Sequence, residues 1–228
     1  MSTTPLKERY KTDVCAKSLR VNEIFLSLQG ETSKIGLPTA FIRLTGCPLR
    51  CRYCDTEYAF YEGDKISIGG ILQTISEYRT RHVTVTGGEP LAQKYCPLLL
   101  TRLCDEGYQV SLETNGAMDV SCVDPRVVKI LDIKTPGSAE VDKNRFSNLE
   151  YLYGHDQIKF VICDRNDYEW SKQILDEYRL GDRCEVLFSN SYDELRAGDL
   201  ADWILEDKLP VRLQIQLHKV LWGDIPGK

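Results

Sequence analysis

The sequence predicts an α/β fold built on a parallel sheet, and three observations support this prediction. Strand-like apolar segments alternate with helical segments along most of the chain, which is the pattern of repeated β-α-β units. Polar or glycine-rich motifs directly follow five of the strand-like segments, and parallel strands carry their ligands at their carboxyl ends. The length of 228 residues suffices for one domain with a substantial core. We therefore expect the motifs to meet at one rim of a single-domain sheet.

The beginning of the chain is expected to form a partly flexible leader over residues 1–20, followed by a single domain over residues 21–228. The first 17 residues are polar and charged and lack the apolar core of a signal peptide. Val21–Leu28 and Ala40–Leu44 are apolar and are expected to be strands. The polar connection between them contains Gly36 and Pro38, which indicates a loop.

Periodicity predicts the remaining elements in turn. Ile71–Tyr78 is expected to be helical, and His82–Thr86, rich in β-branched residues, is expected to be a strand. Leu91–Glu106 is expected to be one helix, because Gly107 after it is a stop signal. Later strands are expected at Gln109–Leu112, Val127–Ile133, Gln157–Cys163, Glu185–Phe188 and Val211–Leu217. Two further helices are expected at Asn166–Tyr178 and Asp193–Leu205.

The composition argues against several classes of protein. The net charge is −5, from 29 basic and 34 acidic residues, which argues against a broad nucleic-acid surface. No apolar run approaches the length of a membrane span. The nine cysteines are an odd number without the spacing of a disulfide framework, so a reducing, cytoplasmic setting is expected.

Three of the cysteines form a compact motif. They lie in the run Gly46-Cys47-Pro48-Leu49-Arg50-Cys51-Arg52-Tyr53-Cys54-Asp55-Thr56, with the spacing Cys-x-x-x-Cys-x-x-Cys. A 4Fe–4S cluster is usually held by four thiolates, so three leave one iron open. The alternative is structural zinc, which usually takes four ligands as two separated pairs. The other six cysteines are expected to be small core residues; they are Cys15, Cys96, Cys104, Cys122, Cys163 and Cys184.

The cysteine spacing is the signature of the radical S-adenosylmethionine (SAM) enzymes, and the chain resembles that superfamily. The resemblance implies that Cys47, Cys51 and Cys54 hold a 4Fe–4S cluster whose open iron binds SAM, which is then cleaved to a 5′-deoxyadenosyl radical. It also implies the fold, an incomplete TIM-like (β/α) barrel of the radical SAM type with a reduced helix complement. Tyr53 occupies a position that is commonly aromatic and near the SAM adenine; without the cysteines, a surface tyrosine would be the better interpretation.

Further strand-end motifs resemble the SAM contacts of the superfamily. Thr86-Gly87-Gly88-Glu89-Pro90 looks like its Gly-Gly-Glu motif, whose backbone and carboxylate accept hydrogen bonds from the SAM ammonium. The alternative is a plain strand-to-helix turn. Lys134 is expected to pair with the SAM carboxylate and Asp132 with the ribose, unless both are solvated strand-end residues. The expected SAM contacts are Tyr53, Asp55, Gly88, Glu89, Asp132, Lys134, Ser189 and Asn190.

A second group of motifs narrows the resemblance to the 7-carboxy-7-deazaguanine synthase family. These motifs are Gln29-Gly30-Glu31, Arg43, the Cys-Asp-Thr end of the cysteine run and Gln216-Leu217-His218-Lys219. The resemblance implies conversion of 6-carboxy-5,6,7,8-tetrahydropterin to 7-carboxy-7-deazaguanine, a step of queuosine and 7-deazapurine biosynthesis. In this lyase reaction, hydrogen is abstracted from C6, the ring contracts and ammonia is lost, while SAM is regenerated.

The residue types suit that substrate. A pterin presents an amidine–lactam edge, which amide and carboxylate groups such as those of Gln29 and Glu31 can read. Arg43 offers a fork for the substrate carboxylate. The expected substrate contacts are Leu28, Gln29, Gly30, Glu31, Arg43, Thr86 and His218. The alternatives are a polar turn at residues 29–31, an outward-facing strand arginine and strand-end packing of His218.

Other expectations come from the resemblance alone. Thr56 matches a threonine that binds Mg²⁺ in the family, and Mg²⁺ prefers oxygen ligands. A homodimer and an electron donor such as flavodoxin are expected as partners, with neither nucleic acid nor a membrane. Two alternatives remain, a glycyl-radical-enzyme activating enzyme and a non-catalytic Fe–S or zinc-binding module.

Overall fold

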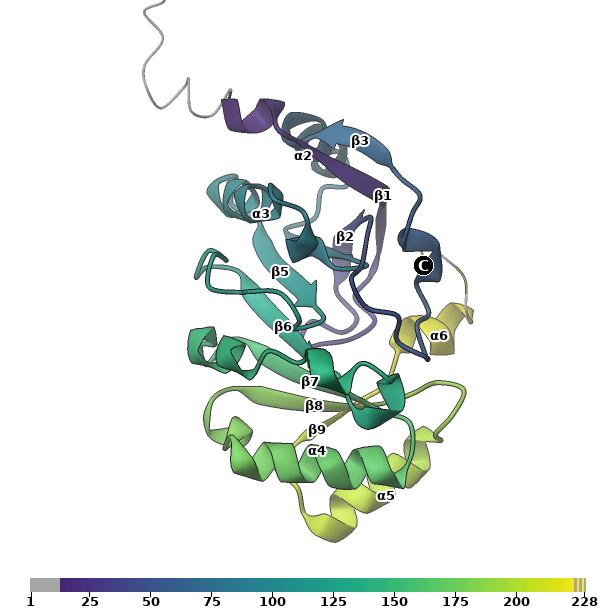
Figure 1. Ribbon diagram of the computed structural model, residues 1–228. Coiled ribbons are helices and arrows are strands. Elements are labelled where there is room, and N and C mark those ends of the chain that lie inside the picture. Colours follow the sequence, from purple (N-terminus) through teal and green to yellow (C-terminus); the bar gives the residue numbers. More distant parts are fainter. Residues whose placement is uncertain (1–12, 224, 226, 228) are drawn as a thin grey trace, which may run out of the picture.

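The computed structural model describes residues 13–223, 225 and 227, and one curved sheet organises them. The sheet has nine strands in the order β3-β1-β2-β4-β5-β6-β7-β8-β9. The strands are β1 (Ser18–Leu28), β2 (Pro38–Leu44), β3 (Asp64–Ser67), β4 (His82–Gly87), β5 (Gln109–Thr114), β6 (Val128–Ile133), β7 (Gln157–Ile162), β8 (Glu185–Asn190) and β9 (Arg212–Gln214). The end strands β3 and β9 do not pair with each other, so the barrel is incomplete, as expected (Figure 1).

The helices cover only part of this sheet. Besides the helical residues 13–16, they are α2 (Ile68–Ser76), α3 (Cys96–Asp105), α4 (Arg165–Glu177), α5 (Ala197–Asp207) and α6 (Leu217–Trp222). Residues 115–127, between β5 and β6, contain no helix, and the connection from β6 to β7 contains only short 3₁₀ segments. The reduced helix complement predicted from the resemblance is therefore confirmed. In Figure 1, α4 and α5 lie beside β7, β8 and β9, and α3 lies beside β5.

The first strands depart from the predicted parallel arrangement. β1 pairs antiparallel with β2 and with β3, whereas the pairs from β2 to β9 are parallel. The connection over residues 29–37 is too short for a parallel crossover, which needs about a dozen residues or more. The β1–β2 hairpin therefore closes one side of the otherwise parallel sheet.

Strand β4 shows how the sequence builds a barrel with a polar interior. Its valines, Val83 and Val85, belong to the buried apolar core. The alternate side chains point to the other face of a strand. Thr84 Oγ1 contacts Ser111 Oγ on β5 at 2.8 Å, and Thr86 lines the central cavity. One strand thus packs an apolar face into the core and presents hydroxyls to the interior.

Several element boundaries differ from those predicted. The expected helix Leu91–Glu106 divides into a 3₁₀ segment, Pro90–Ala92, and α3, which begins only at Cys96. The helix expected from Asp193 begins at Ala197, and the strand expected over Val211–Leu217 is only Arg212–Gln214. Leu217 instead begins α6, which was not predicted, and the short strand β3 was also missed.

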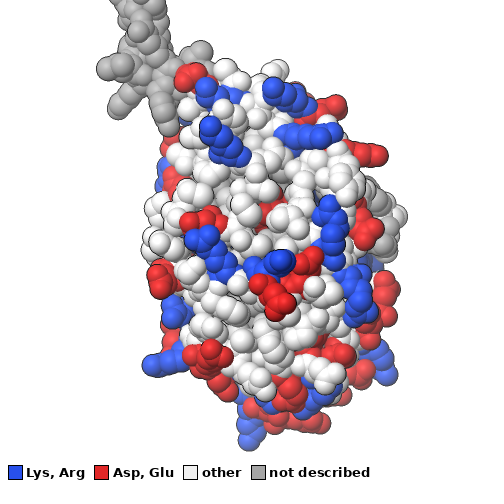
Figure 2. Space-filling view, viewed as in Figure 1, with Lys and Arg blue, Asp and Glu red and all other residues white. Residues whose placement is uncertain are grey.

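The predicted leader is described only in part. Residues 13–16 are helical, and β1 begins at Ser18 and pairs with β3, so the last residues of the leader belong to the sheet. Its first 12 residues lie outside the described part of the chain. Among the described residues, no helix has the length and apolar character to cross a membrane. Acidic and basic side chains are interspersed over the face shown in Figure 2.

Candidate active site

A cavity of about 710 Å³ lies at the carboxyl ends of the strands. Its volume falls within the range of about 300–1,000 Å³ that is typical of ligand and cofactor sites. The cavity wall includes all the residues expected from the sequence to contact cofactor, metal or substrate except Glu89. These are Leu28, Gln29, Gly30, Glu31, Arg43, Cys47, Cys51, Tyr53, Cys54, Asp55, Thr56, Thr86, Gly88, Asp132, Lys134, Ser189, Asn190 and His218. Motifs from opposite ends of the chain therefore meet in one place.

The cysteine loop is fixed by backbone contacts before any ligand is considered. The Cys54 amide donates to the Cys51 carbonyl over 3.1 Å, which forms a turn, and the Arg52 amide donates to the Ser138 carbonyl over 3.0 Å. Cys47 Sγ accepts from the Leu49 amide at 3.4 Å. Burial raises the pKa of the Cys51 thiol to about 11, so the thiols must lose their protons when metal binds.

The Gly-Gly motif packs directly against this loop. Gly87 has a φ of +147°, and a Cβ on it would lie 2.1 Å from the Leu44 carbonyl oxygen. A Cβ on Gly88 would lie 2.3 Å from the Gly46 carbonyl oxygen and 2.8 Å from Cys47 Cβ. Only glycine fits such a close approach, so these glycines bring the end of β4 to the base of the cysteine loop.

Glu89 is buried behind the cavity wall, at the end of β4. Its side chain is 0% exposed and is not part of the cavity wall. The carboxylate accepts from the Leu91 amide at 2.9 Å, from Thr114 Oγ1 at 2.9 Å and from the Asn115 amide at 2.7 Å. In this arrangement the carboxylate joins the ends of β4 and β5, and its expected bond to the SAM ammonium stays a prediction.

The wall formed by β6 and the cysteine loop carries unsatisfied polar atoms. Lys134 Nζ lies 3.1 Å from Asp132 Oδ2 and 5.8 Å from the centre of the Tyr53 ring. Burial would lower the pKa of Lys134, but the Asp132 carboxylate, together with Tyr53 and Cys51, raises that pKa overall. Asp132 Oδ1 and the Tyr53 hydroxyl are buried and lack a hydrogen-bond partner within the described residues. Buried polar atoms are rarely left unpaired, so these two atoms point to a ligand.

The opposite wall carries amide, hydroxyl and carboxylate groups. Gln29 Nε2 donates to Thr84 Oγ1 at 3.1 Å, and Thr86 Oγ1 donates to Glu113 Oε2 at 2.8 Å. Burial, and next the charge of Glu31, raise the pKa of the Glu113 carboxyl. This wall can therefore both donate and accept hydrogen bonds.

Arg43 and His218 border the same wall. Arg43 Nε donates to Glu23 Oε1 at 2.7 Å, and its guanidinium lies 5.8 Å from the Phe25 ring centre. The side chain remains part of the cavity wall. A Cβ on Gly30 would lie 2.1 Å from His218 Nδ1, so Gly30 allows α6 to close against the turn after β1.

Thr56 and Asp55 form a polar corner at the end of the cysteine loop. Thr56 Oγ1 donates to Asp55 Oδ1 at 2.8 Å, and Lys219 Nζ lies 3.3 Å from Asp55 Oδ2. Burial opposes ionisation of Asp55, but Lys219 and the Thr56 hydroxyl lower its pKa to about 2. The Thr56 hydroxyl directs its proton to this carboxylate and so keeps its oxygen lone pairs for another partner.

Several residues of the cavity were not among the predicted contacts. Asn115 Nδ2 approaches Cys47 Sγ at 3.5 Å, and Gln216 Nε2 donates to Glu31 Oε1 at 3.0 Å. Gln216 lies in the motif Gln216-Leu217-His218-Lys219, and Glu113 and Asn115 lie in a polar segment that directly follows the strand expected at Gln109–Leu112. Lys159 carried a weaker signal, a charge within an apolar strand. Of the cysteines expected in the core, Cys96, Cys163 and Cys184 are buried, but Cys122 is exposed. That expectation was therefore wrong for Cys122, which follows β5 in the turn-rich segment rather than in an apolar element.

Comparisons with known proteins place the chain in a family. The model of the radical SAM superfamily matches residues 41–179. A 7-carboxy-7-deazaguanine synthase from Chlorobaculum tepidum is 41% identical over 208 residues, covering 90% of this chain and 94% of the relative. A protein of the same name from Koribacter versatilis is 41% identical over 219 residues, covering 90% and 97%. The chain belongs to the 7-carboxy-7-deazaguanine synthase family.

A solved structure supports the fold. The crystal structure of QueE from Escherichia coli matches with a TM-score of 0.73 and 23% identity, and it covers 87% of this chain and 94% of the other. Radical SAM enzymes use a 4Fe–4S cluster and SAM, so these two predicted cofactors are confirmed for the family. The matches do not favour a glycyl-radical-enzyme activating enzyme or a zinc-binding module.

Proposed function

We propose that this protein converts 6-carboxy-5,6,7,8-tetrahydropterin to 7-carboxy-7-deazaguanine with loss of ammonia. The observation that carries the proposal is the coincidence of family membership with one cavity that collects both sets of expected contacts. One side of the cavity offers three thiols, and the other offers the groups that suit a pterin edge.

The residues beside the cysteine loop fit the two cofactors. Cys47, Cys51 and Cys54 would hold the cluster, and the backbone of Gly87 and Gly88 would approach SAM closely. When bound, the cluster and SAM supply the radical chemistry that removes hydrogen from C6 of the substrate. The orphaned Asp132 Oδ1 suits a ribose hydroxyl, and the Lys134 ammonium suits the SAM carboxylate.

The opposite wall suits the pterin. The Glu31 and Glu113 carboxylates and the Gln29 amide can accept from or donate to its amidine–lactam edge. Arg43 and a Mg²⁺ ion on Thr56 would hold the substrate carboxylate, with Mg²⁺ keeping several of its waters. Binding the carboxylate and the ring edge at separate places fixes the position of C6 between them.

A homodimer, a flavodoxin-like electron donor and a cytoplasmic location complete the proposal. Each comes from the resemblance, and the cysteine count supports the reducing location. Light scattering coupled to gel filtration checks the dimer, which predicts twice the chain mass of 26.0 kDa. Reduction of the cluster by flavodoxin, followed by its absorbance, checks the electron donor.

An anaerobic turnover experiment tests the reaction. Protein reconstituted to about four irons and four sulfides per chain is incubated with SAM, a reductant, Mg²⁺ and the carboxypterin. The expected products are 7-carboxy-7-deazaguanine and ammonia in equal amounts, with less SAM consumed than product formed. Fully loaded protein that binds SAM but returns the pterin unchanged would contradict the proposal.

A further inference from the structure

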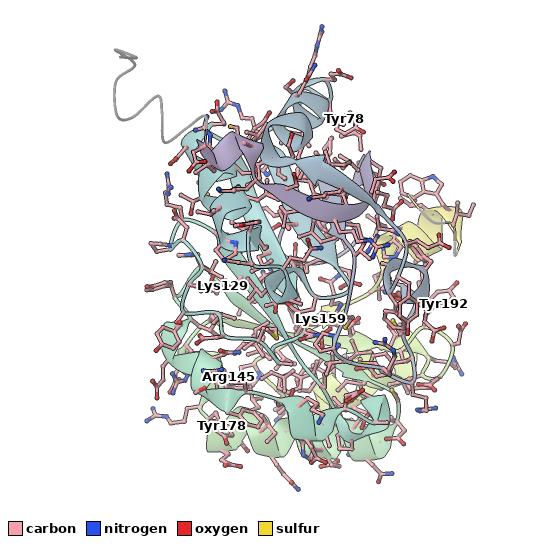
Figure 3. The ribbon with its side chains drawn as sticks, turned by 45° about the horizontal axis from the view of Figure 1, so that its top comes forward. Tyr78, Lys129, Arg145, Lys159, Tyr178 and Tyr192 are labelled. Carbon is pink, nitrogen blue, oxygen red and sulfur yellow. The ribbon has the colours of Figure 1, made fainter. Side chains whose placement is uncertain are left out.

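The cavity contains a buried cation, Lys159, that none of the expected contacts included. Lys159 lies on β7, where Ile158 and Phe160 belong to the apolar core. Lys159 and Val161 alternate with them and line the cavity instead. Because Lys159 pairs in register with Asp132 on β6, it lines the cavity beside the wall expected to bind SAM. Figure 3 labels Lys159 in the middle of the molecule.

Lys159 reaches across the barrel to Glu31. Its Nζ donates to Glu31 Oε2, and the side chains of the pair are only 14% and 13% exposed. The other oxygen of Glu31 accepts from Gln216 Nε2 at 3.0 Å, and the Glu31 amide donates to Gln29 Oε1 at 3.2 Å. The carboxylate is thus held at both oxygens, in the turn expected to read the substrate.

From these contacts we infer that Lys159 is a positioning residue, whose ammonium fixes the orientation and the negative charge of the Glu31 carboxylate toward the substrate. This inference rests on the proposed function, since it assigns Glu31 to the pterin. It gives Lys159 a role through another side chain and not through the reacting atoms.

Glu31 is largely buried near other carboxylates, so a fixed cation is needed to keep it ionised. The groups that face the Lys159–Glu31 pair are His218 on α6, Glu113 on β5, Asp132 on β6 and Asp55 in the cysteine loop. Burial would raise the pKa of Glu31, but Lys159, with smaller contributions from Gln216 and His218, lowers that pKa overall. Without Lys159, burial and the nearby carboxylates would favour protonation of Glu31, and a protonated carboxyl carries an O–H donor where the carboxylate only accepts.

The test compares Lys159→Met with the wild type in the reconstituted enzyme. Methionine keeps much of the length of the side chain but removes its charge. The KM for the carboxypterin is expected to rise on the order of ten- to a hundredfold, the effect of losing a charge-assisted hydrogen bond, and to rise by a larger factor than kcat falls. SAM affinity is expected to change less than pterin affinity.

The pH profile separates positioning from a general loss of structure. In Lys159→Met the pKa of Glu31 rises, so Glu31 is protonated at the acid end and ionises as the pH increases. The KM of the variant is therefore expected to fall with rising pH across the neutral range, while that of the wild type stays flat. Lys159→Arg, which keeps the charge, is expected to restore the flat profile.

A double variant and a matched control complete the experiment. In the Glu31→Gln background, Lys159→Met is expected to change KM by less than about twofold, because the carboxylate that it positions is gone. Lys129→Met breaks another buried pair, Lys129–Asp156 at 2.9 Å, outside the cavity, and is expected to leave the pH profile of KM flat. Additive effects of Lys159→Met and Glu31→Gln, or the same profile in Lys129→Met, would overturn the inference.

Two further outcomes are covered: a Lys159→Met variant that does not fold, and a wild type that does not convert the pterin. If Lys159→Met does not fold, the Glu31 carboxyl is titrated in the wild type by ¹³C NMR, assigned by its loss in Glu31→Gln. A pKa below the usual glutamate range supports the inference, and one above that range overturns it. Failure of the wild type to convert the pterin would count against the proposed reaction, whereas this titration still tests the pair.

Discussion

Two lysines on neighbouring strands, Lys129 and Lys159, show the difference between a pair that holds the fold and a pair that serves the site. Lys129 is 1% exposed and its partner Asp156 is 0% exposed. Asp156 also accepts from the amides of Lys129 and Tyr153 at 2.7 and 2.8 Å, so its oxygens are satisfied within the protein. Figure 3 marks both lysines, with Lys159 in the barrel interior.

The cavity side is different because its polar groups are incompletely paired. Asp132 Oδ1 and the Tyr53 hydroxyl have no hydrogen-bond partner in the described chain. Glu113 accepts from Gln29 Nε2 and Thr86 Oγ1 and forms no ion pair with any described residue. An unpaired buried polar atom costs about 1–3 kcal/mol. The unpaired polar atoms of the barrel interior therefore lower the stability of the ligand-free protein, and a bound ligand can relieve this by pairing with them. The Lys129–Asp156 pair needs no ligand, because its groups are already paired.

The largest effect is expected from the cysteine loop. Cys51→Ala should abolish cluster binding and turnover, because two thiolates do not hold a cubane in the required arrangement. Iron and sulfide analysis and the brown cluster absorbance measure the loss. Cys122→Ser is the matched control, since Cys122 is exposed and lies outside the cavity wall; its iron content and turnover should equal those of the wild type. A full cluster in Cys51→Ala would refute the assignment of the loop.

The next largest effect, on stability, is expected at the buried Lys129–Asp156 pair. Asp156→Ala leaves the Lys129 ammonium buried without its partner, which should lower the free energy of unfolding by about 3–5 kcal/mol. Denaturant unfolding of the apoprotein measures this change. Asp182→Ala, which breaks the exposed pair with Arg179, should cost at most about 1 kcal/mol. If both variants lose the same free energy of unfolding, then the buried Lys129–Asp156 pair contributes no more to stability than an exposed pair.

Much of the fold could be predicted from the sequence because its signals are local. The alternation of Val83, Thr84, Val85 and Thr86 reports a strand between a core and a polar interior. The boundaries were less predictable, since Leu91–Glu106 reads as one periodic helix although the chain turns at Gln93 before α3. The antiparallel direction of β1 was also missed, because it depends on the short connection over residues 29–37 and not on the periodicity of the strand.

The site was predictable where chemistry is concentrated in short motifs. Cysteine spacing and paired glycines are visible without a structure, and they do line the cavity. Lys159 was missed because its partner Glu31 is 128 residues away, and a charge in an apolar strand carries no sign of its partner. The bonds from Thr114 and the Asn115 amide to the Glu89 carboxylate could not be predicted either, because these residues are about 25 positions away along the chain.

A smaller effect is expected at Arg43, on the wall opposite the cluster. Arg43 Nε is engaged by Glu23, so a fork toward the substrate would use the terminal nitrogens. Lysine keeps the charge but not the fork, and Arg43→Lys should weaken pterin binding by about 1–3 kcal/mol. Isothermal titration with SAM and with the pterin compares the two ligands. A loss of SAM affinity as large as the loss of pterin affinity would place Arg43 with the cofactor instead.

The smallest effect is expected at Thr56, and it tests the proposed metal. Thr56 Oγ1 donates its proton to Asp55, which leaves its lone pairs for Mg²⁺. Thr56→Ala removes one neutral ligand, and the expected loss in pterin affinity is about 1 kcal/mol. Turnover of the wild type should rise with added Mg²⁺, and the variant should lose most of that response while keeping its cluster. Thr56→Ser keeps the hydroxyl and should keep the response. If exhaustive chelation leaves wild-type turnover unchanged, then Thr56 serves only to fix the Asp55 carboxylate at the end of the loop, as a side-chain hydroxyl in a turn commonly does.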